Sequence, residues 1–106
     1  MFDKMLPIGS IVLLNNAIKK TMIIGYMQMT DKEKNRLYDY VGVMYPGGSL
    51  GASTQFLFNH DDIQDIIFTG YKNSEFDKLI EALNEQADKD PEFAQAISSR
   101  IISTEK

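Results

Sequence analysis

The fold is decided by a strand-like run, LYDYVGVMY at residues 37–45, which ends in the turn sequence PGGS at residues 46–49. Side chains alternate between the two faces of a β-strand, and this run carries apolar residues on both faces. We expect the odd-numbered set, with Val41 and Val43, to face the core, although Asp39 falls within it.

Two tyrosines of this run, Tyr38 and Tyr40, are candidate contact residues. They have the parity opposite to the expected core face. Tyrosine is enriched at recognition surfaces because it buries a large area while keeping a polar end. Their position leaves core packing and contact with a partner both open.

Further strands are predicted on both sides of this run. Short apolar stretches rich in β-branched or aromatic residues are separated by turn residues or by the charged stretch 30–36, which predicts a hairpin loop. Gly25 lies inside the second stretch and marks a bulge or a sharp bend. The turn residues after Phe58 predict one helical turn over residues 61–64. The predicted strands are residues 11–14, 17–29, 37–45, 54–58 and 65–71.

The last third of the chain predicts two helices. Ser74 can cap the first, which carries an apolar stripe at the spacing i, i+3, i+4, i+7, and Asp90-Pro91 begins the second. In the second helix Phe93, Ile97 and Ile101 repeat every four residues. Such faces pack either on their own sheet or on a partner. The candidate partner-binding residues of the helices are Phe76, Leu79, Ile80, Leu83, Phe93 and Ile97.

The predicted fold class is therefore α+β. Residues 1–72 form a small five-stranded antiparallel sheet or an SH3-like, partly closed barrel, and residues 73–106 form an acidic helical tail. The tail either packs on the sheet or extends from it, within one domain overall.

Composition limits the classes of partner. The 106-residue chain has a net charge of −4, and residues 73–106 carry eight acidic and four basic side chains against seven of each in residues 1–72. This distribution disfavours nucleic acid as a partner, because phosphate recognition needs a basic patch. The short Lys19-Lys20 run is interpreted as a solvated hairpin end. No signal peptide or membrane-spanning segment is predicted, so we expect a cytoplasmic protein without membrane insertion.

The sequence offers little chemistry for catalysis. With no cysteine and one histidine, it lacks the ligands of a usual zinc site, and no cofactor is expected. His60 lies beside Asp61 and Asp62, but these residues suit caps and turns better than a metal or acid–base cluster. The glycine-rich residues 45–51 lack the lysine of a phosphate-binding loop. We therefore expect a protein that is not an enzyme.

Several motifs in order resemble one known family. They are LPIGSIVLL at residues 6–14, MIIG at 22–25, YDYVGVMYPGG at 38–48, FLFNHDDI at 56–63 and FTGY at 68–71. The combination is similar to the family of domains of unknown function numbered 4176, over residues 6–72.

The resemblance implies a biological setting. Members of that family occur in Firmicutes, often beside genes for type VII secretion and LXG-domain toxins. The resemblance therefore implies a cytoplasmic accessory protein that binds another protein, as a chaperone or targeting adaptor for a secreted LXG toxin. An immunity protein that neutralises a cognate toxin and a generic SH3-like interaction module are the alternatives. No catalytic residues are implied.

Overall fold

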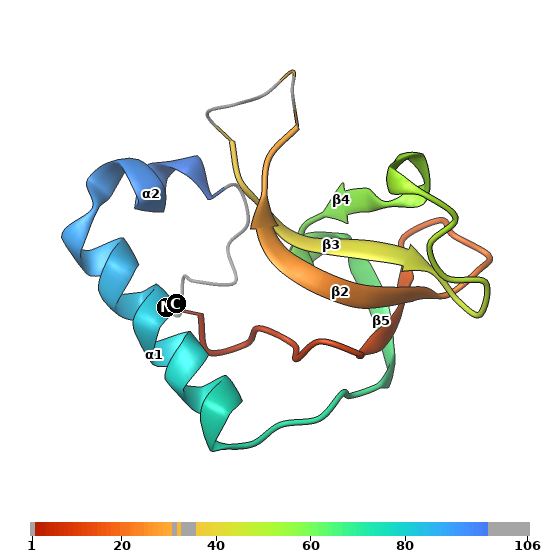
Figure 1. Ribbon diagram of the computed structural model, residues 1–106, viewed down its shortest axis with the longest axis horizontal. Coiled ribbons are helices and arrows are strands. Elements are labelled where there is room, and N and C mark those ends of the chain that lie inside the picture. Colours follow the sequence, from red (N-terminus) through yellow and green to blue (C-terminus); the bar gives the residue numbers. More distant parts are fainter. Residues whose placement is uncertain (1, 31, 33–35, 98–106) are drawn as a thin grey trace.

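The computed structural model describes residues 2–30, 32 and 36–97. A five-stranded sheet comes first in the chain and two helices follow it (Figure 1), so the predicted α+β class is confirmed. Ile101 of the predicted second helix lies outside the described residues. The elements are β1 Ile11–Leu14, β2 Thr21–Gln28, β3 Tyr38–Met44, β4 Phe56–Phe58, β5 Ile63–Phe68, α1 Ser74–Lys89 and α2 Pro91–Ala96, with single helical turns at Ala52–Thr54 and His60–Asp62.

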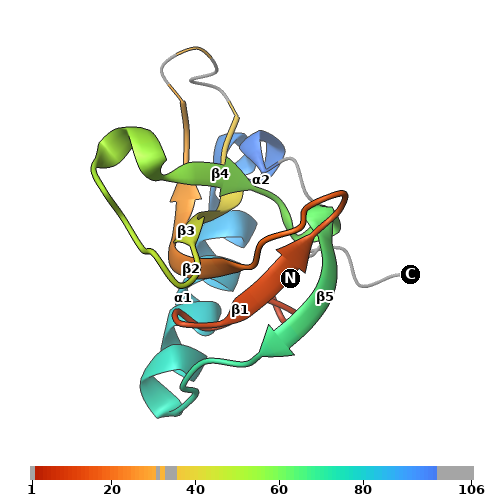
Figure 2. The ribbon, with the colours of Figure 1, turned by 90° about the vertical axis from the view of Figure 1, so that its right-hand side faces the viewer.

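The sheet is antiparallel throughout and open. Its strand order is β4-β3-β2-β1-β5, so β4 and β5 are the two edges. Figure 2 shows these two strands at opposite sides of a curved sheet. The open five-stranded alternative is confirmed, and the barrel does not close.

The predicted bend in β2 is present. The register between β2 and β3 shifts between Ile23 and Gly25. A Cβ atom built on Gly25 would lie 2.7 Å from Val41 Cγ1, so only glycine permits this approach of the two strands. The β2 strand begins at Thr21 rather than Ala17, because residues 15–20 form the turn that joins it to β1.

The central strand β3 is buried on both faces. The predicted core face is confirmed as buried at Asp39, Val41 and Val43, but the opposite face is buried as well. Tyr40 has no exposed surface and belongs to the main hydrophobic core, together with Phe58 on the neighbouring β4. Val41 and Val43 are also buried, but they lie outside that cluster. Residues 2–7 and the helices cover the face of the sheet that carries Tyr40. The alternation of side chains along one strand cannot predict that other segments cover this face.

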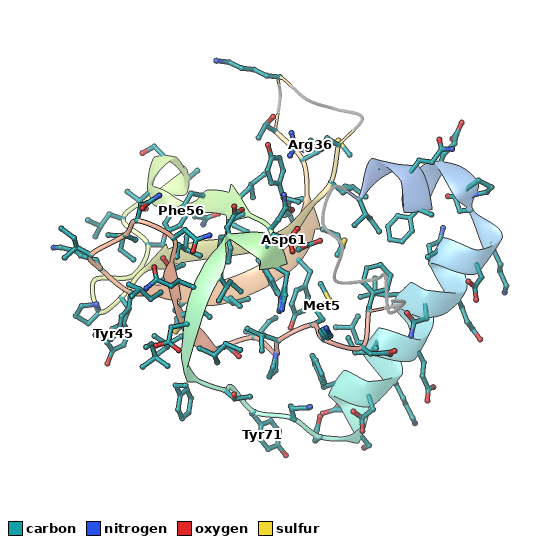
Figure 3. The ribbon with its side chains drawn as sticks, turned by 180° about the vertical axis from the view of Figure 1, so that it is seen from behind. Met5, Arg36, Tyr45, Phe56, Asp61 and Tyr71 are labelled. Carbon is teal, nitrogen blue, oxygen red and sulfur yellow. The ribbon has the colours of Figure 1, made fainter. Side chains whose placement is uncertain are left out.

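The N-terminal segment lies between the sheet and the helices. Phe2, Met5 and Leu6 are buried in the same core cluster as Tyr40, and Figure 3 shows Met5 between the sheet and α1. The Phe2 amide donates a hydrogen bond of 2.7 Å to Asn84 Oδ1 of α1. The helices therefore attach to the sheet largely through this segment.

Two tyrosine hydroxyls hold the segment at Leu6. The Leu6 N–H donates to the Tyr40 hydroxyl oxygen at 3.1 Å, and the Tyr26 hydroxyl donates to the Leu6 carbonyl at 2.7 Å. Burial raises the pKa of Tyr26 to about 12 and also raises that of Tyr40. Both hydroxyls therefore keep their protons at neutral pH and remain available as donors.

The helix caps follow local sequence closely. Asn73, rather than Ser74, caps α1, and its Oδ1 accepts from the Phe76 N–H at 3.1 Å. Asp90 caps α2, with Pro91 at the first helical position, as predicted.

The end of α2 is joined to the start of β3. The Leu37 N–H donates to the Ala96 carbonyl at 2.7 Å, and Leu37 and Ile97 form a parallel β-bridge. Both side chains are buried. This contact ties the described part of the helical tail to its own sheet.

Replacing Tyr26 with phenylalanine tests the hydrogen bonds at Leu6. We expect Tyr26→Phe to lower the free energy of unfolding by about 1–2 kcal/mol, because the carbonyl of buried Leu6 loses its donor in a partly buried place. The matched control is Tyr71→Phe, since Tyr71 is 79% exposed, and it should change stability by less than about 0.5 kcal/mol. Equal losses in urea denaturation of the two variants would contradict this role.

Candidate functional site

The two sheet tyrosines predicted as contact residues differ in position. Tyr38 is half-buried, and the Arg36 guanidinium carbon lies 5.0 Å from the centre of its ring. Tyr40 is fully buried and hydrogen-bonded, so of the two alternatives left open for it the structure shows core packing, and Tyr40 is not a surface contact residue. Its ring packs with those of Tyr26 and Phe58 in the core.

The predicted helical stripe packs mainly on the chain itself. Ile80, Leu83 and Phe93 are partly buried against the core cluster, and Ile97 is 3% exposed within it. Phe2 stacks at a tilt on Phe93, with 6.3 Å between ring centroids. Most of the stripe is therefore used by the fold.

Two stripe residues remain nearer to the surface. Phe76 is half-buried, with Lys72 Nζ 5.8 Å from its ring centre, and Leu79 is 38% exposed. Alone they form a narrow surface, because the rest of the stripe faces residues 2–7.

The cluster around His60 connects β3 to the start of β5. His60 Nδ1 lies 2.8 Å from the Tyr40 hydroxyl, and its backbone N–H donates to Asp39 Oδ2 at 2.8 Å. The Asn59 N–H donates to Asp62 Oδ2 at 2.8 Å and thereby caps the short helical turn. No group of three or more potential metal ligands occurs within residues 2–30, 32 and 36–97.

The partly buried position of His60 favours its neutral form. Burial lowers its pKa from the ordinary value of 6.5, against a smaller opposing effect of Asp61. In the neutral tautomer that leaves Nδ1 unprotonated, the Tyr40 hydroxyl can donate to Nδ1 while accepting from the Leu6 N–H. The imidazole therefore completes the hydrogen bonding of the buried tyrosine.

An apolar groove lies at the end of the sheet away from the helices. Its volume is about 480 Å³, and its walls come from the end of β1, the turn before β2, the end of β3 and the start of β4. Figure 3 shows Phe56 and Tyr45 at this end of the molecule. The lining residues are Leu14, Asn16, Ala17, Ile18, Lys19, Thr21, Met44 and Phe56.

A second hollow of about 290 Å³ shares Ile18 and Lys19 with the groove, and adds Lys20, Tyr45 and Pro46. Together these two hollows form what we call the loop-end groove. Ile18 is 94% exposed, and Met44 and Tyr45 are 40% and 44% exposed. Such a grouping of exposed apolar side chains in a concave surface is typical of a binding site.

The charge of the loop-end groove is positive. Lys19 and Lys20 are exposed at its rim, and none of the described residues that line it is acidic. The acidic first turn of α1, with Glu75 and Asp77, belongs to the other end of the molecule. The groove can therefore accept apolar side chains beside carboxylates.

The sequence did contain one sign of this site. Ile18 stands between turn residues and Lys19-Lys20, a place where an apolar side chain gains nothing in a solvated hairpin end. The other walls include Met44 and Phe56, which are distant from Ile18 in the sequence, so no local pattern predicts the hollow. The sequence therefore does not predict the groove, and it places the two lysines only in a solvated turn.

In comparisons with known proteins, the model of the family described as "Domain of unknown function (DUF4176)" matches residues 5–79. No match was found among curated proteins or among solved structures. No helix in the described part of the chain is long and apolar enough to cross a membrane.

The lowered pKa of His60 predicts a pH dependence of stability. As the pH falls from about 7.5 to about 5.5, the unfolded chain binds a proton at His60 near pH 6.5 while the folded chain resists it, so the free energy of unfolding should decrease. His60→Asn keeps an acceptor close to the position of Nδ1 and cannot titrate. We expect its loss of stability over this interval, measured by urea denaturation, to be smaller than that of the unchanged protein. Identical losses would contradict the assignment.

Proposed function

The chain belongs to the DUF4176 family, and we propose that it is a non-catalytic protein-binding accessory protein whose loop-end groove receives an acidic, apolar segment of its partner. The observation that carries the proposal is the groove itself, in which exposed Ile18 and Met44 stand beside two lysines.

The apolar part of the groove would supply most of the affinity. Burying a side chain the size of isoleucine contributes about 1.5–3 kcal/mol, and Ile18 is almost fully exposed in the free protein. The flexible side chain of Met44 can adapt to the shape of a partner. Tyr45 adds an apolar ring with a polar hydroxyl. A partner segment with one or two large apolar side chains would fill these hollows.

The lysines would select the charge of the partner and speed its association. Charges at the rim of an interface act mainly on specificity and on the association rate. Lys19 and Lys20 therefore favour a segment with carboxylates next to its apolar residues and disfavour a basic segment.

Family membership suggests the biological partner. The association of such domains with type VII secretion favours a chaperone or targeting adaptor for an LXG toxin, acting in the cytoplasm before export. In this role the groove would cover an apolar segment of the toxin that is otherwise exposed before transport.

Binding to a purified LXG toxin encoded at the same locus tests this function. By isothermal titration calorimetry, Ile18→Glu and the double change Lys19→Glu with Lys20→Glu should each weaken binding about tenfold or more, equivalent to about 1.4 kcal/mol. The first change loses apolar contact and both introduce repulsion of carboxylates.

The control is Lys78→Glu, which also makes the net charge more negative, but on the exposed surface of α1, and should leave binding within about twofold. No binding to the toxin, or equal weakening by Lys78→Glu, would overturn the proposal. Protection of cells that express the toxin in its active form would instead indicate an immunity protein.

A further inference from the structure

The outer edge of β5 is open. This strand pairs with β1 on one side and has no strand partner on its other side within residues 2–30, 32 and 36–97. Unpaired N–H and C=O groups on a strand edge readily pair with another strand. The other edge strand, β4, has only three residues, and such shortness limits pairing.

The β5 edge is also unusually apolar. Ile66, Ile67 and Phe68 are 46%, 47% and 58% exposed. The strand contains neither lysine nor proline, the residues that commonly protect an edge, and Asp65 is its only charged residue. Burial of this edge would therefore remove apolar surface as well as satisfy main-chain groups.

The edge continues beyond the assigned strand. The Gly70 N–H donates to Ser10 Oγ at 2.9 Å, which keeps the chain beside the segment that precedes β1. Tyr71 follows with 79% exposure, and Lys72 is exposed. The edge thus runs from Asp65, with a negative charge, through apolar residues to Lys72, with a positive charge.

We propose that this edge pairs antiparallel with the same edge of a second copy of the chain, forming a two-fold dimer that is separate from the loop-end groove. A two-fold axis near Phe68 brings Asp65 beside the partner's Lys72, and the same contact occurs twice. An axis at Asp65, near the middle of β5, would instead bring the two Asp65 carboxylates together, which is unfavourable. The order of charges therefore selects a second copy as the occupant and sets the register.

Two bulges in β5 restrict the contact. The register between β5 and β1 shifts twice, once between Ile11 and Val12 and once between Leu13 and Leu14. Such bulges increase the local twist of a strand. The pairing is consequently short, and we expect a dimer that dissociates on dilution.

Sedimentation velocity on the full chain, over about 5 to 500 µM, tests the dimer. The unchanged protein should shift from monomer to dimer across this range. Asp65→Lys and Lys72→Glu should each weaken association about tenfold or more, because each puts like charges together at both contacts. Lys78→Glu changes the net charge as Lys72→Glu does, and should leave the dimer unaffected.

Mixing the two single variants provides the decisive comparison. An equimolar mixture of Asp65→Lys and Lys72→Glu should dimerise about as well as the unchanged protein, because each contact again joins opposite charges. This recovery also excludes misfolding as the cause of the single losses. A protein that stays monomeric throughout, single variants that still dimerise, or a mixture that does not recover would each overturn the proposal.

The calorimetric measurement of toxin binding tests the loop-end groove. Sedimentation of the protein without toxin tests the dimer at the β5 edge. No residue of β5 belongs to the described lining of the groove. Failure of one proposal is therefore distinguishable from failure of the other.

Discussion

Two tyrosine hydroxyls hold the main chain at Leu6, one at its N–H and one at its carbonyl, and the position of the helices depends on this attachment. Residues 2–7 are the layer on which α1 and α2 pack, through Phe2 and its neighbours. Because the two hydrogen bonds are made to main-chain atoms of Leu6, they fix the path of the N-terminal segment as well as its distance from the sheet. The helices and the sheet consequently share one hydrophobic core.

This arrangement explains where free surface remains. Tyr40 bonds to both Leu6 and His60, and the apolar side chains of α1 and α2 cover the N-terminal segment. Tyr40 and most of the apolar helix residues, which the sequence offers as candidates for binding a partner, are thus used inside the fold. Exposed apolar residues remain at the periphery, around Ile18 at the loop end and around Phe68 on the β5 edge. Recognition of partners would therefore take place at the ends and edges of the sheet.

Predictions from the sequence succeeded where the cause is local. Asp90 caps α2 because a carboxylate followed by proline suits the start of a helix within a few residues. The irregularity at Gly25 was also predicted, from the presence of a glycine inside a strand-like run. The predicted cap of α1 was Ser74, whereas the preceding residue Asn73 is the cap, so this prediction was wrong by one position. The sequence left the burial of Tyr40 open, because that burial depends on residues 2–7 of the same chain. The loop-end groove is not predicted for the same reason, since the stretch from Leu14 to Thr21 meets Met44 and Phe56, which are distant in the sequence, at its walls.

The sequence by itself determined the five strands, the two helices, their order and the absence of cysteine chemistry. These features follow from hydrophobic periodicity, turn residues and caps, which act over a few positions. Only the tertiary structure decided that the sheet stays open, which face of β3 forms the main core and where the exposed surfaces lie. The contacts responsible join residues 34 positions apart, for Leu6 and Tyr40, and 82 positions apart, for Phe2 and Asn84. No local pattern specifies such pairs, because they form when separate segments pack together.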